Sequence, residues 1–130
     1  MFEKFAKSSE NTLYVIFRVV VGLLFAMHGL SKLGWIGGKE AMTGLFLVVG
    51  IGELLVGLGI LTGLLTRISA LGGLVIMIGA QIMSHLPKGI NPMTNGGELS
   101  LLFLVSFLVV FALGAKKLSL GKALFGKELL

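Results

Sequence analysis

Four long apolar stretches constrain what this chain can fold into. They cover residues 13–34, 43–65, 68–86 and 98–114, and each is close to the roughly 20 apolar helical residues that cross a bilayer core. Of the 130 residues, 55% are apolar and only 13% are charged. A soluble domain this small buries too little surface to hide such a composition. We therefore expect an all-α integral membrane protein, a single-domain bundle of four transmembrane helices joined by short loops.

The charges and the missing cysteines exclude several classes of protein. Without cysteine the chain has no disulfide, thiolate metal site or cysteine nucleophile. The net charge of +5 is no sign of nucleic-acid binding, because four of the eleven Lys and Arg residues lie in the last 15 residues, beside a membrane edge. With four spans, one side of the membrane holds most of the cations: Lys4, Lys7, Arg67, Lys116, Lys117, Lys122 and Lys127. The other side holds Lys39 and Lys88, so we predict a multi-pass protein of the cell membrane with both termini in the cytoplasm.

The segments between the spans predict the loops. Residues 66–67 form the shortest break, which predicts a tight hairpin between the second and third spans. Residues 87–97 form the longest break, and its two prolines and the Asn95-Gly96-Gly97 turn signal argue against a helix. Residues 1–12 are polar and predict an amphipathic segment that leads into the first span, not a cleaved signal peptide.

Small residues predict where the helices pack closely, since they let backbones approach in a membrane. One expected ridge lies on the second span and another on the third: Gly52, Gly59 and Gly63, and Ser69, Gly73, Ala80 and Ser84. Gly50 and Gly57 flank Glu53 on one helical face, which indicates a further role beside that residue.

Polar residues inside the spans are the candidates for function, because ionisable groups there are costly and face the bundle interior. Helical spacing puts Arg18, Phe25, His28 and Lys32 on one stripe of the first span, and Gln81 and His85 one turn apart on the third. Judged by depth, we expect five residues to cluster near the outer face: His28, Lys32, Glu53, His85 and Glu98.

Structural explanations compete with this interpretation. Glu53 and Arg18 can form a buried ion pair that fixes helix register. Lys32 and Arg67 can reach water by extending their side chains, and Glu98 can compensate the dipole at a helix N-terminus. A metal site is the weaker idea, because no HxxxH or ExxH pair lies on one helix. We expect no metal, and nothing in the sequence requires a haem.

Several motifs, taken together, resemble those of one family. They are Arg18-x3-Gly22-x2-Phe25-x2-His28-Gly29-x2-Lys32, Glu53-x3-Gly57-x-Gly59, Thr66-Arg67-x2-Ala70, His85, and Gly96-Gly97-Glu98. The combination resembles the DoxX family of four-span membrane proteins, over nearly the whole chain from Arg18 to Leu120. One difference is Gly121, which follows Ser119 and Leu120 where that family often has Asp.

The resemblance implies redox chemistry at the membrane, with an electron carrier supplied by a bound quinone or by a partner subunit. Phe25 and Met77 are expected to line an apolar slot for the ring, with Arg18, Lys32 and Gln81 as further ligand-binding residues. His28, Glu53, His85 and Glu98 are expected to hydrogen-bond the ligand and exchange protons. The expected partners are lipid, a redox subunit or further copies of this chain, and no nucleic acid.

Two other functions stay open at this point. The same cavity could serve a transporter that binds a small anion near Arg18, Lys32 and Arg67. Alternatively, the chain could be a non-catalytic assembly subunit of a membrane redox complex. Against the transporter, the two halves of the sequence show no internal repeat.

Overall fold

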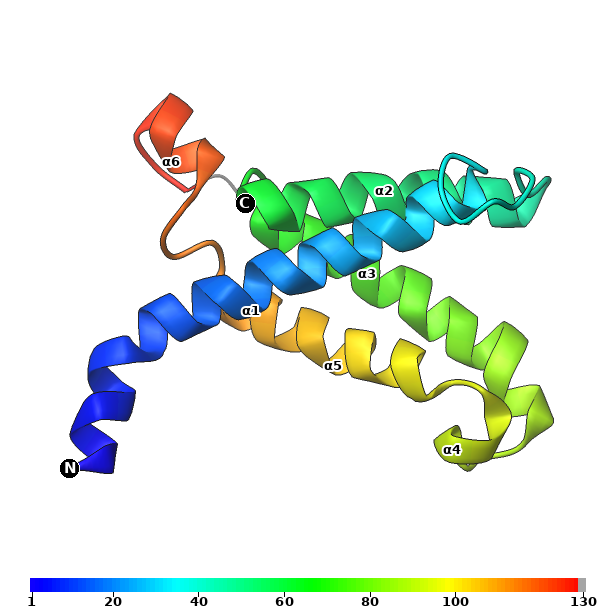
Figure 1. Cartoon of the computed structure of the whole chain (residues 1–130), viewed down its shortest axis with the longest axis horizontal. Helices are drawn as coiled ribbons and strands as arrows, with labels where there is room; N and C mark the ends of the chain where they lie inside the picture. Colours follow the sequence, from blue (N-terminus) through cyan, green and yellow to red (C-terminus); the bar gives the residue numbers. More distant parts are fainter. Residues whose placement is uncertain (129–130) are drawn as a thin grey trace.

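Residues 1–128 are described by a computed structural model and are helical apart from their loops. In chain order the elements are α1 (Phe2–Lys32), α2 (Leu45–Thr62), α3 (Thr66–Ala80), η1 (Gln81–His85), η2 (Leu86–Lys88), α4 (Pro92–Asn95), α5 (Glu98–Leu113) and α6 (Leu120–Phe125) (Figure 1). A π-helical turn, η1, and a 3-10 turn, η2, continue α3 without a break. The expected all-helical bundle is confirmed.

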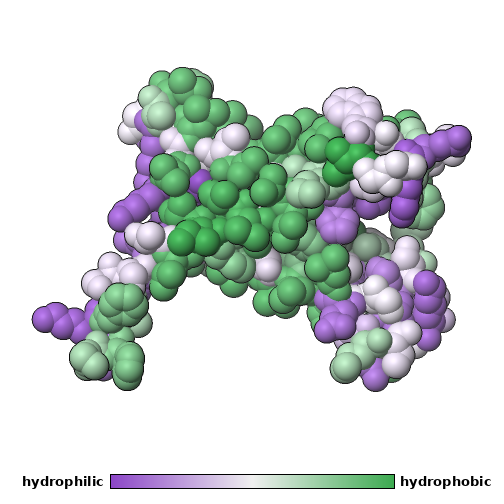
Figure 2. Space-filling view, in the orientation of Figure 1, coloured by the Kyte–Doolittle hydropathy of each residue, from purple (hydrophilic) through white to green (hydrophobic). Residues whose placement is uncertain are grey.

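Three helical segments are long and apolar enough to cross a membrane: α1, α2 and Thr66–Lys88. The fourth expected span, α5, is apolar but has only 16 residues, which is about 24 Å at 1.5 Å per residue. Figure 2 shows apolar side chains over the middle of the molecule and hydrophilic ones gathered toward its two ends. This distribution is the one expected of a bundle whose middle faces lipid.

Two loop predictions need correction. The hairpin between α2 and α3 turns at residues 63–65, where Gly63 adopts a left-handed conformation with φ 74° and ends α2. Thr66 and Arg67 therefore begin α3 instead of forming the break. The expected loop 87–97 is partly helical. Its prolines do not prevent this, because Pro87 and Pro92 lie in the first turns of η2 and α4, where a proline costs no hydrogen bond.

The closest helix packing joins α1 to α2. A Cβ added to Gly22 would lie 2.8 Å from the carbonyl oxygen of Gly57, and one added to Gly29 would lie 2.6 Å from that of Gly50. The backbones of the two helices therefore touch at both places, which only glycine permits. The ridges predicted from sequence missed this contact, although their residues Gly59 and Ser69 do meet between α2 and α3, and Gly73 packs against the ring of Phe107.

An aromatic cluster fills the middle of the bundle. Phe25 of α1 lies 4.8 Å from Phe107 and 5.2 Å from Phe103 of α5, measured between ring centroids. Around it pack Val21, Val56, Ile60, Ala70, Met77 and Val110. The backbones run closest together between α1 and α2 and between α3 and α5, whereas α1 and α5 meet mainly through the rings of Phe25, Phe103 and Phe107. Figure 1 shows the two pairs diverging toward α4; we call this the α4 end, and the opposite end of the bundle the α6 end.

Arg18 holds the α6 end together. Its side chain is fully buried, and its guanidinium donates to the backbone carbonyls of Ala115, Lys117 and Leu118, the last two at 2.9 and 2.6 Å. The hydroxyl of Tyr14 adds a 2.6 Å hydrogen bond to the carbonyl of Gly114. These bonds fix the segment that follows α5 against α1. The buried Arg18–Glu53 ion pair considered from sequence is not formed.

Candidate functional site

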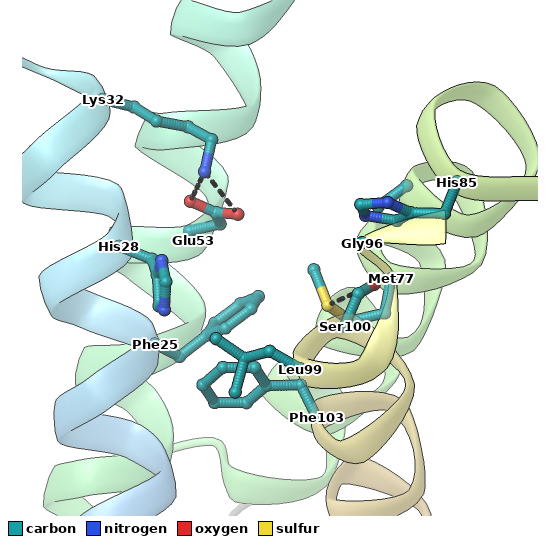
Figure 3. A pocket seen from close by; sticks show the side chains of 11 residues that line it. Phe25, His28, Lys32, Glu53, Met77, His85, Gly96, Leu99, Ser100 and Phe103 are labelled. Atoms are coloured by element: carbon teal, nitrogen blue, oxygen red, sulfur yellow. Dashed lines mark hydrogen bonds and ion pairs between the residues drawn. The ribbon is translucent and has the colours of Figure 1, made fainter. Parts of the chain in front are cut away.

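A cavity of about 200 Å³ opens between the diverging helix pairs at the α4 end. Its walls carry both aromatic and ionisable side chains, drawn from α1, α2, the α3–η1 rod and α5 (Figure 3). They are Phe25, His28, Lys32, Glu53, Met77, Ala80, His85, Gly96, Leu99, Ser100 and Phe103. Six residues expected from sequence are therefore brought to one cavity: Phe25, His28, Lys32, Glu53, Met77 and His85.

The α1–α2 wall carries an ion pair. Lys32 Nζ lies 2.8 Å from Oε2 and 3.1 Å from Oε1 of Glu53, and only 4% of Glu53 is exposed. The close helix packing makes this contact short, because a Cβ on Gly50 would come within 2.7 Å of Lys32 Cβ. Gly50 thus leaves the room through which Lys32 reaches the carboxylate, which explains why a glycine flanks Glu53.

Aromatic rings form the floor of the cavity. Phe25 and Phe103 lie beneath the ion pair in Figure 3. The imidazole of His28 stands edge-on to Phe103, with ring centroids 5.6 Å apart and planes at 89°. His28 is exposed and lines the cavity, so its nitrogens are free to meet a ligand. Such a floor suits a flat, apolar ring with polar groups at its edge.

The opposite wall is built around His85. Its Nδ1 lies 3.3 Å from the carbonyl oxygen of Asn95, and a Cβ on Gly97 would come within 2.9 Å of the histidine side chain. Asn95 is almost fully buried, donates to the carbonyl of Gly89 at 2.9 Å and accepts from the amide of Gly97 at 2.7 Å. Asn95 therefore orders the loop against which His85 rests.

Asn95 was predicted from sequence only as a turn residue, and Ser100 was not predicted as a site residue. The hydroxyl of Ser100 lies 3.5 Å from Met77 Sδ and joins α5 to α3 at the cavity wall. The turn signal Asn95-Gly96-Gly97 was the available hint of a structured wall. Ser100 carried no such signal, because its position depends on where α5 begins.

Three residues expected at the ligand lie elsewhere. Arg18 is at the α6 end, where backbone carbonyls occupy its guanidinium. Gln81 is half-buried and donates to the carbonyl of Gly97 at 2.9 Å, so it ties η1 to the start of α5 without lining the cavity. Glu98 opens α5, is exposed and is also outside the lining. The prediction that these three residues line the cavity was therefore wrong.

The chemistry available here is hydrogen bonding and proton exchange. Two imidazoles, one carboxylate and one ammonium surround a space with an aromatic floor. Within residues 1–128, no three His, Asp or Glu side chains lie close enough together to hold a metal ion.

Comparison with known proteins identifies the family. The DoxX family matches residues 13–86, more than half of the chain. The chain belongs to the DoxX family. A protein of Haemophilus influenzae named only as an uncharacterized protein is 33% identical over 119 residues, which cover 85% of this chain and 89% of that protein. No solved structure matches significantly.

The matched part of this DoxX protein contains most of the cavity. It runs from Leu13 through η1, so it includes Phe25, His28, Lys32 and Glu53 of the cavity and ends one residue after His85. The α5 side of the cavity, with Ser100 and Phe103, lies outside the match.

Proposed function

We propose that the cavity at the α4 end binds the headgroup of a quinone, and that this DoxX protein is the membrane subunit of an oxidoreductase. The supporting observation is the pairing of an aromatic floor with ionisable groups on two facing walls. A quinone needs an apolar slot for its ring and hydrogen-bonding groups at its two carbonyls. Phe25 and Phe103 fit the ring, while His28 and His85 lie on opposite walls.

The volume and position also suit this ligand. A space of about 200 Å³ has room for one or two fused six-membered rings but not for a long tail. The cavity lies where the backbones of α1 and α5 stay apart, and its lining includes Leu99, an exposed apolar side chain. An isoprenoid tail can therefore extend between the helix pairs into lipid.

The chain's own residues would act on protons. When bound, a quinone supplies two-electron chemistry, which requires protons to be delivered to its oxygens. His28 and His85 can donate or accept a proton at either wall, and Glu53 can exchange one with Lys32 or with water. Because the chain has no cysteine and no dinucleotide motif, we infer that electrons come from a partner subunit.

The transporter alternative finds less support. Its three cations lie at opposite ends, Lys32 at the cavity and Arg18 and Arg67 at the α6 end. They therefore make no common anion site. The assembly-subunit alternative differs from the proposal in one respect, since it needs no ligand in the cavity.

Extraction of lipids from the purified protein tests the proposal. We expect quinone in about stoichiometric amount, lost from the His28→Ala and Glu53→Gln variants. The double variant should weaken binding of an added short-chain quinone by clearly less than the two single effects combined, because groups acting on one ligand are not additive. Wild-type protein that carries no quinone and binds none on addition would rule the proposal out in favour of an assembly role.

A further inference from the structure

The first helix is longer than a bilayer needs. Residues 13–32 of α1 span about 30 Å, the thickness of the hydrocarbon core. Residues 2–12 add about 16 Å beyond it, at the α6 end of the bundle. Figure 1 shows these first turns standing away from the other helices and running at an angle to the rest of α1. No described element packs over them, so their side chains are free to meet a partner outside the bundle.

This segment has two distinct faces. At 100° per residue, Met1, Phe2 and Phe5 fall within one third of the circumference, with exposures of 96%, 83% and 69%. The charged side chains of Glu3, Lys4, Lys7 and Glu10 fall on the opposite side. Figure 2 shows both apolar and hydrophilic side chains on this projecting segment. A helix of this kind lies in a membrane surface with its apolar face toward the acyl chains.

Two serines adapt the segment to that position. Ser8 Oγ and Ser9 Oγ both donate to the carbonyl of Phe5, at 2.9 and 2.6 Å. Their hydroxyls are thereby satisfied within the helix, so Ser9, which falls on the apolar face between Phe2 and Phe5, can contact lipid without losing a hydrogen bond. Serines bonded back to the preceding turn also bend helices, which fits the angle seen in Figure 1.

Charge at this end selects the kind of lipid. Seven cations belong to it besides the buried Arg18: Lys4, Lys7, Arg67, Lys116, Lys117, Lys122 and Lys127. The acids are Glu3, Glu10 and Glu128, and Glu128 is engaged by Arg67 at 3.3 Å and by the amide of Ala115 at 3.0 Å. The excess of lysines favours anionic headgroups, because each lysine near a negatively charged membrane surface adds electrostatic attraction.

We propose that residues 2–12 form an anionic-lipid-binding arm that lies in the membrane surface at the α6 end, with Phe2 and Phe5 in the acyl region. The arm holds the bundle at a fixed depth and orientation. This inference is independent of the ligand in the cavity.

The chain has a single tryptophan, Trp35, so replacing it leaves one introduced tryptophan as the only source of tryptophan fluorescence. In a Trp35→Phe background, Phe5→Trp puts a fluorophore on the apolar face, and Asn11→Trp puts one on the polar face nearer the span. Each full-length variant is reconstituted in phosphatidylcholine vesicles with and without phosphatidylglycerol. Quenching by brominated phosphatidylcholine reports contact with lipid, and quenching by iodide reports contact with water.

We expect Trp at position 5 to be quenched by brominated lipid at least about twofold more than Trp at position 11, and more so with phosphatidylglycerol. Lys4→Gln with Lys7→Gln should remove the effect of phosphatidylglycerol. An arm that extends into water would give the reverse order, since position 11 is nearer the bilayer, and would overturn the proposal. Protection of position 5 from both quenchers would also overturn it, because a protein would then cover the face. Equal quenching with and without phosphatidylglycerol would refute the preference for anionic lipid.

Discussion

The ammonium of Lys32 contacts both carboxylate oxygens of Glu53, so the two residues link α1 to α2 beside an open cavity. Removing one partner leaves a buried or half-buried charge without compensation, which costs about 3 kcal/mol or more. We expect Glu53→Gln and Lys32→Met each to lower the stability of the protein in detergent. The double variant should be less destabilised than the sum of the two, as thermal unfolding can measure. Strictly additive losses would mean that the pair contributes no mutual stabilisation.

The α1–α2 contact predicts unequal effects at two glycines. A Cβ at Gly22 would lie 2.5 Å from the amide nitrogen of Leu61, whereas one at Gly79 would meet nothing within 4 Å. Gly22→Ala should therefore destabilise the protein by about 1–3 kcal/mol. Gly79→Ala should be neutral or gain up to about 1 kcal/mol from helix propensity. Equal melting temperatures for the two variants would show that α1 and α2 can move apart without loss of stability.

The loop around Asn95 should matter for both stability and ligand. Asn95→Ala removes one buried and one part-buried hydrogen bond and leaves the buried amide of Gly97 without this partner, at a cost of about 1–3 kcal/mol. Because His85 rests on this loop, we also expect quinone affinity to fall, which titration of a short-chain quinone would measure. Asn91→Ala is the control, since it removes only the exposed N-cap of α4. An Asn95 variant that melts normally would contradict the proposed support.

Arg18 should protect the segment that follows α5. Without its guanidinium, the carbonyls of Ala115, Lys117 and Leu118 lose their donor, so Arg18→Met should expose Lys116 and Lys117 to trypsin. We expect cleavage there to speed up about tenfold or more in detergent, because proteolysis follows local opening. Arg67→Met is the comparison and should speed cleavage less, since Arg67 is linked to this segment only indirectly, through Glu128, which accepts from the amide of Ala115. Equally slow cleavage of both variants and the wild type would assign the anchoring to other contacts.

Helix periodicity predicted the bundle and most of one wall of the cavity. Phe25, His28 and Lys32 share a stripe on one regular helix, so their common orientation follows from spacing alone. Glu53 could be placed near them by its depth in the second span. The identity of its partner could not, because whether Lys32 or Arg18 reaches it depends on how closely α1 and α2 pack, and that follows from Gly29 and Gly50 acting together.

The other wall depended on local geometry that periodicity does not describe. Glu98 was expected inward because of its depth, but its direction depends on where α5 starts, one residue after Gly97. Arg18 shared the stripe of His28 and yet lies at the other end of the bundle, bound to carbonyls of a segment nearly a hundred residues away. Such distant backbone partners leave no local pattern in a sequence.

The π-helical turn at Gln81–His85 makes the length of this segment as important as its composition. A π turn arises when one extra residue is accommodated in an α-helix. If the same residues, the extra one included, wound as a regular α-helix, all that follows would be rotated by about 100°. His85 would then leave its place beside Asn95 and Gly97, so the π turn keeps this histidine on the cavity wall.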